Sequence, residues 1–109
     1  MEEKITKRLP LGSIVILNGG VQKLMIISRA MLIPIQNKQY LFEYGGCVYP
    51  QGLVSDRVFY FNTEDISEVV FEGFSDEDDI RMNKNIDKWT EDKGFEKGTV
   101  KMLKNKGQA

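Results

Sequence analysis

The 109-residue sequence contains no histidine, and this absence excludes several kinds of active site. Histidine is the usual general base near neutral pH, a member of serine- and cysteine-based catalytic triads, and a common metal ligand. A hydrolase built on Ser13 or Ser55 would lack its usual base. Glu64 and Asp65 offer carboxylates, but both lie in a turn where helix capping already accounts for them. We therefore expect no catalytic residues and no enzyme activity.

Cysteine and long apolar runs are also scarce. The single cysteine, Cys47, excludes an internal disulfide and a cysteine-based zinc site. The acidic residues near Asp76 lack the spacing of a calcium loop, so we expect neither a metal nor a cofactor. No apolar stretch reaches the length of about 18 residues that a membrane-spanning helix needs. The N-terminus lacks the apolar core of a signal peptide. We expect a cytoplasmic protein with no membrane partner.

The net charge of -1 argues against a protein that binds nucleic acid through bulk charge. The charges are nevertheless unevenly placed. Residues 62–80 contain eight acidic residues and no basic one, whereas residues 93–109 contain five lysines and one glutamate. Nucleic-acid binding would have to rely on Lys23, Arg29 and Arg57 with stacked tyrosines, beside that acidic flank. We do not favour it.

Residues 10–74 have the pattern of about five short strands. Asn18-Gly19 between two apolar runs predicts a hairpin, and Gly45-Gly46 predicts a bulge, a sharp bend or the close approach of another backbone. A single helical turn with Thr63 as its cap precedes the last strand. The second strand either bends near residues 28–30 or divides there. The predicted strands cover residues 13–17, 22–33, 39–49, 57–62 and 67–74.

The pattern changes to that of a helix after residue 74. Ser75 is a suitable N-cap, and Met82, Ile86 and Trp89 form one apolar stripe. Gly94 is a suitable stop, so we predict one helix over residues 76–93.

The predicted elements fit one domain with two extensions. We expect a flexible N-terminus over residues 1–9 and a single α+β domain over residues 10–93. Residues 94–109 form a basic tail that is either a short helix or disordered.

Most of the predicted strands are apolar on both faces, and this decides the expected architecture. A sheet with one solvated face would alternate apolar and polar residues. We expect an α+β fold in which a small, strongly bent antiparallel sheet, or an SH3-like roll, of about five strands is followed by one C-terminal helix. A helix about 10 Å across cannot cover a sheet about 20 Å wide. Unless the loops and the tail cover the remainder, an apolar face is left for a partner.

The stretch "YLFEYGGCVYPQGL", residues 40–53, supplies most candidates for that partner surface. Tyrosine suits an interface because its ring is large and its hydroxyl tolerates water. Packing in the core is the alternative, and it stays open for the two tyrosines that flank the glycine pair. A second copy of the chain is another occupant, which would give a homodimer. The predicted partner-binding residues are Tyr40, Tyr44, Tyr49, Gln51, Arg57 and Tyr60.

Three segments, "LPLGSIVILNGGVQKLMIISRA", "YGGCVYPQGL" and "FYFNTEDISEVVFEGFSDED", resemble the bacterial domain of unknown function 4176 family over about residues 8–92. Members of that family are found in Gram-positive bacteria beside type VII secretion genes and LXG-type toxins. The family has no agreed catalytic residues, and the basic tail lies outside the resemblance. The opening "PLGSIVIL" is also similar to the first strand of SH3-like barrels.

The resemblance implies a non-catalytic protein-binding module, a cytosolic chaperone or targeting adaptor that holds a secreted toxin before export. An immunity protein that neutralises a toxin domain is the alternative. In that case the acidic stretch 64–79 would block a basic active site.

Overall fold

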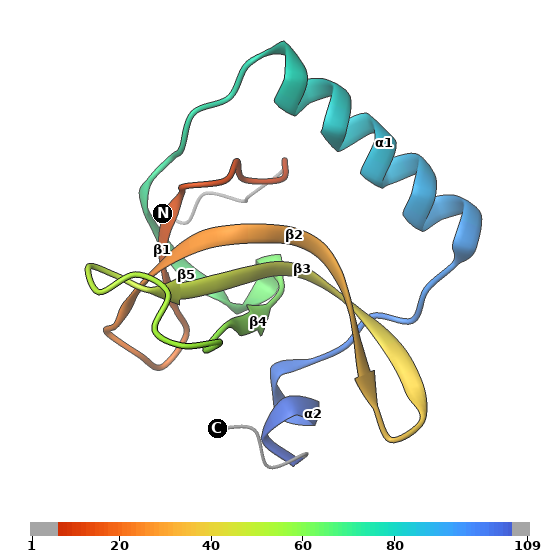
Figure 1. Ribbon diagram of the computed structural model, residues 1–109, viewed down its shortest axis with the longest axis horizontal. Helices are drawn as coiled ribbons and strands as arrows, with labels where there is room; N and C mark the ends of the chain where they lie inside the picture. The colour runs from red at the N-terminus through yellow and green to blue at the C-terminus, as the bar shows by residue number, and fades with distance from the viewer. Residues whose placement is uncertain (1–6, 106–109) are drawn as a thin grey trace.

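The computed structural model describes residues 7–105 as an antiparallel sheet with two helices (Figure 1). The strand order is β4-β3-β2-β1-β5, so the sheet is open, with β4 and β5 at its edges. The α+β class, the five strands and the main helix after them are confirmed. The strands are β1 (Ile14–Leu17), β2 (Lys23–Ile35), β3 (Lys38–Val48), β4 (Phe59–Phe61) and β5 (Ile66–Phe71); a single 3₁₀ turn, η1 (Thr63–Asp65), precedes β5, and the helices are α1 (Glu77–Lys93) and α2 (Val100–Asn105).

The long strands β2 and β3 bend together around the glycine pair. The register between them shifts between Ile26 and Ser28, opposite Gly45. A Cβ on Gly45 would collide with Oγ of Ser28, and one on Gly46 would lie 3.1 Å from the carbonyl oxygen of Met25. The predicted bulge and close approach at Gly45-Gly46 are therefore confirmed. β2 is one continuous strand, and the bend carries the far ends of both strands away from the rest of the sheet (Figure 1).

The first core cluster is centred on Tyr44. The Tyr44 ring is fully buried and stacks on Phe61 with 5.6 Å between ring centroids. Its hydroxyl accepts a hydrogen bond of 2.9 Å from the backbone N–H of Leu9. Leu9 is itself buried, although it lies in the segment predicted to be flexible; residues 1–6 of that segment lie outside the described residues. The other buried members are Val15, Leu24 and Ile26.

The Tyr44 hydroxyl gives a direct test of this core. Burial raises the pKa of this phenol, so it stays neutral and keeps its hydrogen bond throughout the physiological range. Tyr44→Phe keeps the ring but leaves the buried N–H of Leu9 without its acceptor. We expect the variant to lose about 1–3 kcal/mol of unfolding free energy in urea titrations. Tyr49→Phe, which changes a hydroxyl on an exposed ring, is the matched control and should stay within about 0.5 kcal/mol of the wild type.

A second core cluster forms where the chain returns after α1. It buries Ile35, Phe42 and Leu103, with Tyr40 and Tyr60 packed partly against them. Leu103 belongs to α2, so over the described residues the tail forms a short helix, one of the two alternatives that the sequence left open.

Both predicted helix N-caps are wrong by one residue. Asn62, not Thr63, precedes η1 as its N-cap, and Asp76, not Ser75, is the N-cap of α1. The Asp76 carboxylate accepts hydrogen bonds of 3.0 and 3.1 Å from two backbone N–H groups in the first turn. Ser75 instead donates its hydroxyl proton to a carboxylate of that turn. Aspartate and serine are similar as N-caps, so the sequence did not separate them.

The far end of α1 stops as predicted, at Gly94 with a left-handed φ of 62°. The apolar stripe of α1 buries less surface than the sequence predicted. Ile86 is buried, but Met82 is half exposed, and Trp89 packs on Phe95 with 4.7 Å between ring centroids. The stripe therefore does not cover the outer face of the sheet, and α1 depends on polar contacts for its position.

Candidate protein-binding surface

Arg29 of β2 is the centre of the charged network that holds α1. Its guanidinium forms an ion pair of 2.7 Å with Asp79, and its Nη1 also donates to Oδ1 of Asn83 at 3.2 Å. The two charged side chains are only 7% and 12% exposed. On the same side, Arg8 bonds to Asn83 and pairs with Asp87 at 2.9 Å. Arg29 is therefore committed to the fold and is not part of a nucleic-acid surface.

The ion pair fixes the charge state of Asp79. Burial by itself would raise the pKa of this carboxyl, but the hydrogen bond from Ser75 and the ion pair with Arg29 outweigh it. The pKa of Asp79 consequently lies below its ordinary value. Asp79 is thus ionised in the folded state at neutral pH.

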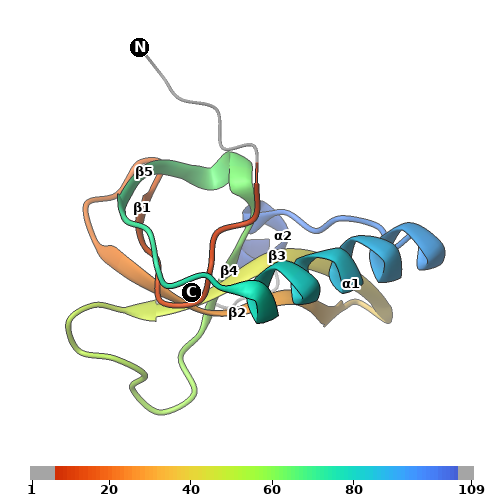
Figure 2. The same cartoon turned by 90° about the horizontal axis from the view of Figure 1, so that it is seen from above.

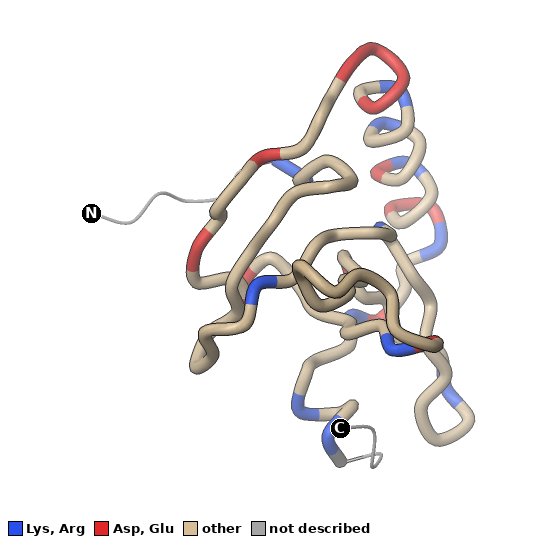
Figure 3. Tube along the Cα trace, turned by 60° about the vertical axis from the view of Figure 1, so that its left-hand side comes forward, with Lys and Arg blue, Asp and Glu red and all other residues tan. Residues whose placement is uncertain are grey.

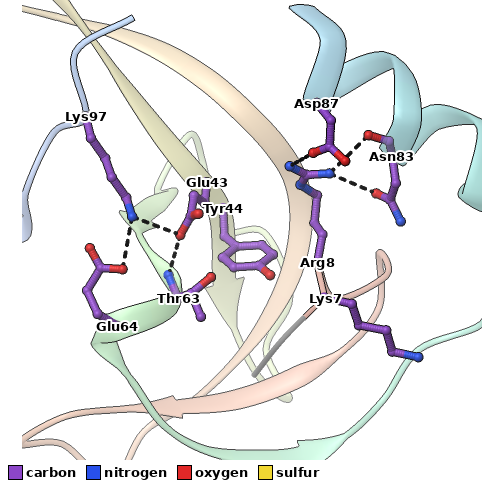
Figure 4. A pocket seen from close by; sticks show the side chains of 9 residues that line it. All are labelled: Lys7, Arg8, Glu43, Tyr44, Thr63, Glu64, Asn83, Asp87 and Lys97. Carbon is purple, nitrogen blue, oxygen red and sulfur yellow. Dashed lines mark hydrogen bonds and ion pairs between the residues drawn. The ribbon is translucent and has the colours of Figure 1, made fainter. Parts of the chain in front are cut away.

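A polar pocket of about 450 Å³ opens beside the N-terminal segment (Figure 4). On one side Lys97 pairs with Glu64 at 3.1 Å and with Glu43 at 3.6 Å. On the other side lie Arg8 and Asp87, already paired with each other. Burial alone would lower the pKa of Lys97, but its two glutamate partners raise it. Because these charges neutralise one another, the pocket explains how the segments are joined and identifies no ligand.

Over residues 7–105, no group of three or more cysteine, aspartate or glutamate side chains is arranged to hold a metal ion. Neither helix of the described region has the length and apolar character needed to cross a bilayer.

The largest exposed apolar side chains follow the outer edge of the sheet. β5 pairs with β1 alone, and its three last residues, Val69, Val70 and Phe71, are all exposed. Phe71 is 60% exposed, and Phe74, just beyond the strand, is 79% exposed. β5 and the end of α1 lie on opposite sides of the molecule, so this helix does not cover the strand (Figures 1 and 2). We call Leu11, Val69, Val70, Phe71 and Phe74 the edge surface.

Ser13 joins the segment before β1 to the segment after β5 and so holds the edge surface in place. It is fully buried, donates its hydroxyl proton to the carbonyl of Pro10 at 2.8 Å, and accepts the N–H of Gly73 at 2.9 Å. Gly73 is pressed so tightly on the backbone of residues 11–13 that a Cβ there would lie 2.9 Å from the nitrogen of Ser13. Leu11, which is 49% exposed, is thereby placed beside the segment that carries Phe71 and Phe74.

Acidic residues flank the edge surface. Glu68 and Glu72 lie on β5 and just after it, and Asp76 to Asp78 follow at the start of α1, all exposed. Figure 3 shows acidic residues, in red, along the segment that leads into α1 and on its first turn. Lys7 pairs with Glu72 at 3.4 Å and Arg81 pairs with Asp78, so two of these carboxylates already have a basic partner. Exposed apolar side chains rimmed by polar groups are typical of a protein interaction site.

The predicted partner-binding residues do not form one surface. Tyr49, Gln51 and Arg57 are exposed on the loop between β3 and β4. Tyr40 and Tyr60 are half buried against the C-terminal segment.

For Tyr44 the structure supports the alternative of core packing, because no part of its side chain reaches solvent.

The sequence predicted an ordinary strand over residues 67–74 and did not reveal the edge surface. Two signals were present, namely a "VVF" run with no alternation and a phenylalanine after Gly73.

These observations define a small α+β domain with an exposed apolar edge and no recognisable catalytic centre among its described residues. A family model described as Domain of unknown function (DUF4176) matches residues 8–82, and the chain belongs to this family. The resemblance to this family is therefore confirmed over residues 8–82, and the association with type VII secretion and LXG-type toxins stays a prediction. No curated protein and no solved structure matches the chain. The match includes the whole sheet and ends inside α1, so the C-terminal segment lies outside it.

Proposed function

We propose that the protein is a non-catalytic protein-binding module that serves in the cytoplasm as a chaperone or targeting adaptor of a type VII-secreted LXG-type toxin. The edge surface supports the binding role: Phe71 and Phe74 expose most of their rings at a strand that has only one neighbour. The family resemblance supports the choice of a toxin as partner. A soluble domain gains little from two exposed phenylalanines unless another chain covers them.

The edge surface restricts the chemistry of the partner segment. Aromatic rings act as anchors when the partner provides an apolar pocket or strip. The exposed acidic residues on β5 and at the start of α1, such as Glu68 and Glu77, favour basic residues beside that strip. The open edge of β5 also accepts an added strand, although its register with β1 contains two irregularities that limit the length of such pairing.

An immunity protein is the second candidate, and the acidic flank favours it. The exposed carboxylates beside the edge surface resemble the anionic groups that a basic active site binds, although Asp76 also caps α1 and Asp78 pairs with Arg81. The two candidates differ in the toxin segment that they bind. An adaptor binds the N-terminal targeting half, and an immunity protein binds the C-terminal catalytic half.

Co-expression with each half of an LXG-type toxin separates the candidates. The N-terminal half is expected to co-purify with the protein, whereas the C-terminal half should not. Val21→Ser, a change at an apolar residue that is 91% exposed in the β1–β2 connection, should co-purify as well as the wild type. Binding of the C-terminal half alone, with rescue of cells that it poisons, would establish immunity instead. Failure of both halves to bind would overturn the proposal.

A further inference from the structure

The C-terminal segment fills a part of β3 that β4 leaves uncovered. β4 pairs only with residues 44–46 of β3. Beside it, the backbone N–H of Leu41 donates to the carbonyl of Glu96, and the N–H of Gly98 donates to the carbonyl of Leu41, each at 2.8 Å. Lys97 thereby forms a short parallel bridge with Leu41. The segment occupies this edge as an added strand would.

Gly98 is the residue that this position selects most strongly. Its carbonyl accepts a hydrogen bond of 2.7 Å from Nδ2 of Asn62, which is itself buried. A Cβ on Gly98 would lie 2.5 Å from two ring atoms of Phe42 and 3.1 Å from Cβ of Tyr40. Phe42 is fully buried and has no room to retreat. Only glycine fits here.

Contacts on both sides of Gly98 add side-chain selectivity. Before it, Lys97 lies between the carboxylates of Glu43 and Glu64. After it, Val100 packs against the first core cluster and Leu103 is buried in the second. The receiving groups therefore recognise a pattern: lysine, glycine, an apolar residue two positions after the glycine, and a second one five positions after it.

The receiving groups and the occupant belong to different parts of the chain. Leu41, Phe42, Asn62 and Glu64 all lie within the family match over residues 8–82, whereas the occupant begins after Gly94 and lies outside it. Within the matched region, the free edge of β3, the amide of Asn62, the ring of Phe42 and the second core cluster therefore all receive contacts from a segment that lies outside the match.

We propose that this edge of β3 is a peptide-binding site, which the chain fills with its own C-terminal segment and which accepts in trans a partner segment of the same Lys-Gly-x-apolar-x-x-apolar chemistry. A short tether gives the resident segment an effective concentration of roughly millimolar. A partner therefore binds weakly until the resident segment is displaced. This site is separate from the edge surface and does not depend on the proposed toxin partner.

A labelled synthetic peptide of residues 94–105 tests the site by fluorescence anisotropy with the full chain. Gly98→Ala and Lys97→Glu in the protein both weaken the resident segment. Each is expected to increase affinity for the wild-type peptide by about tenfold or more, because the apparent dissociation constant falls as the open fraction rises. A peptide carrying Gly98→Ala should not bind saturably. Lys101→Ala, at an exposed residue of α2, should bind as the wild type does.

Three results would overturn the proposal: no saturable binding to either variant, equal binding of the glycine and alanine peptides, or equal affinity of the variants and the wild type. If Gly98→Ala does not fold, Lys97→Glu still decides, because Lys97 is partly exposed and its replacement leaves the core clusters intact. Binding of the toxin has no influence on any of these outcomes.

Discussion

Replacing Phe71 and Phe74 together by serine is expected to weaken binding of the toxin partner by at least about 100-fold. Both rings are more than half exposed, so they contribute little to the folded core. Central aromatic anchors cost about 2 kcal/mol or more each when truncated, and about 2.8 kcal/mol already corresponds to a factor of 100 in affinity. Isothermal titration calorimetry gives the affinity, and urea unfolding gives the stability of the same variant.

The stability measurement is what makes this result specific. The double variant should unfold within about 1 kcal/mol of the wild type, because surface substitutions rarely cost more. Val21→Ser, the matched apolar control, should change neither quantity. An unchanged affinity in the double variant would show that the partner binds elsewhere. A large loss of stability would show that the two rings support the fold.

Arg29→Ala is expected to lower the free energy of unfolding by about 3 kcal/mol. The substitution leaves Asp79 as a nearly buried carboxylate without its partner, and breaking such a pair on one side is strongly destabilising. It also removes the link between β2 and the first turns of α1, which few apolar contacts replace. Lys7→Ala is the control, because Lys7 and Glu72 form an exposed pair that should contribute less than about 0.5 kcal/mol.

The same ion pair predicts how stability depends on pH. The pKa of Asp79 is lowered in the folded state, so its contribution to stability is present above the unfolded pKa of about 4. That contribution is lost as the pH falls through the lower folded pKa. The difference in unfolding free energy between the wild type and Asp79→Asn should therefore shrink on acidification below about pH 4. A difference that stays constant would show that the ion pair does not act as described.

Local steric rules explain what the sequence predicted well. The bend at Gly45-Gly46 and the end of α1 at Gly94 follow from requirements that few residues other than glycine meet. The apolar character of both strand faces likewise predicted a bent sheet with more apolar surface than one helix covers.

The failures concern contacts between distant residues. Arg29 and Asp79 are fifty positions apart in the sequence, and no pattern in either segment predicts their ion pair. In the sequence Gly98 looks like part of a loose tail, and only its contact with the Phe42 ring shows why glycine is required there. The partner surface was placed on the tyrosines because of their composition, but the strand order decided which apolar residues stay exposed. Only the topology shows that β5 has a single neighbour.

The two proposed sites are independent because they use opposite edges of the sheet. The edge surface follows β5, whereas the C-terminal segment lies on β3 beside β4. A variant at one site should therefore leave binding at the other unchanged.

Amide chemical shifts of the ¹⁵N-labelled protein, recorded during titration with the N-terminal half of the toxin, show directly whether the edge surface binds it. Saturable perturbations are expected at residues 69–74, and none at Val21. Saturable binding that leaves residues 69–74 unperturbed, with shifts confined to the loop of residues 49–58, would contradict it.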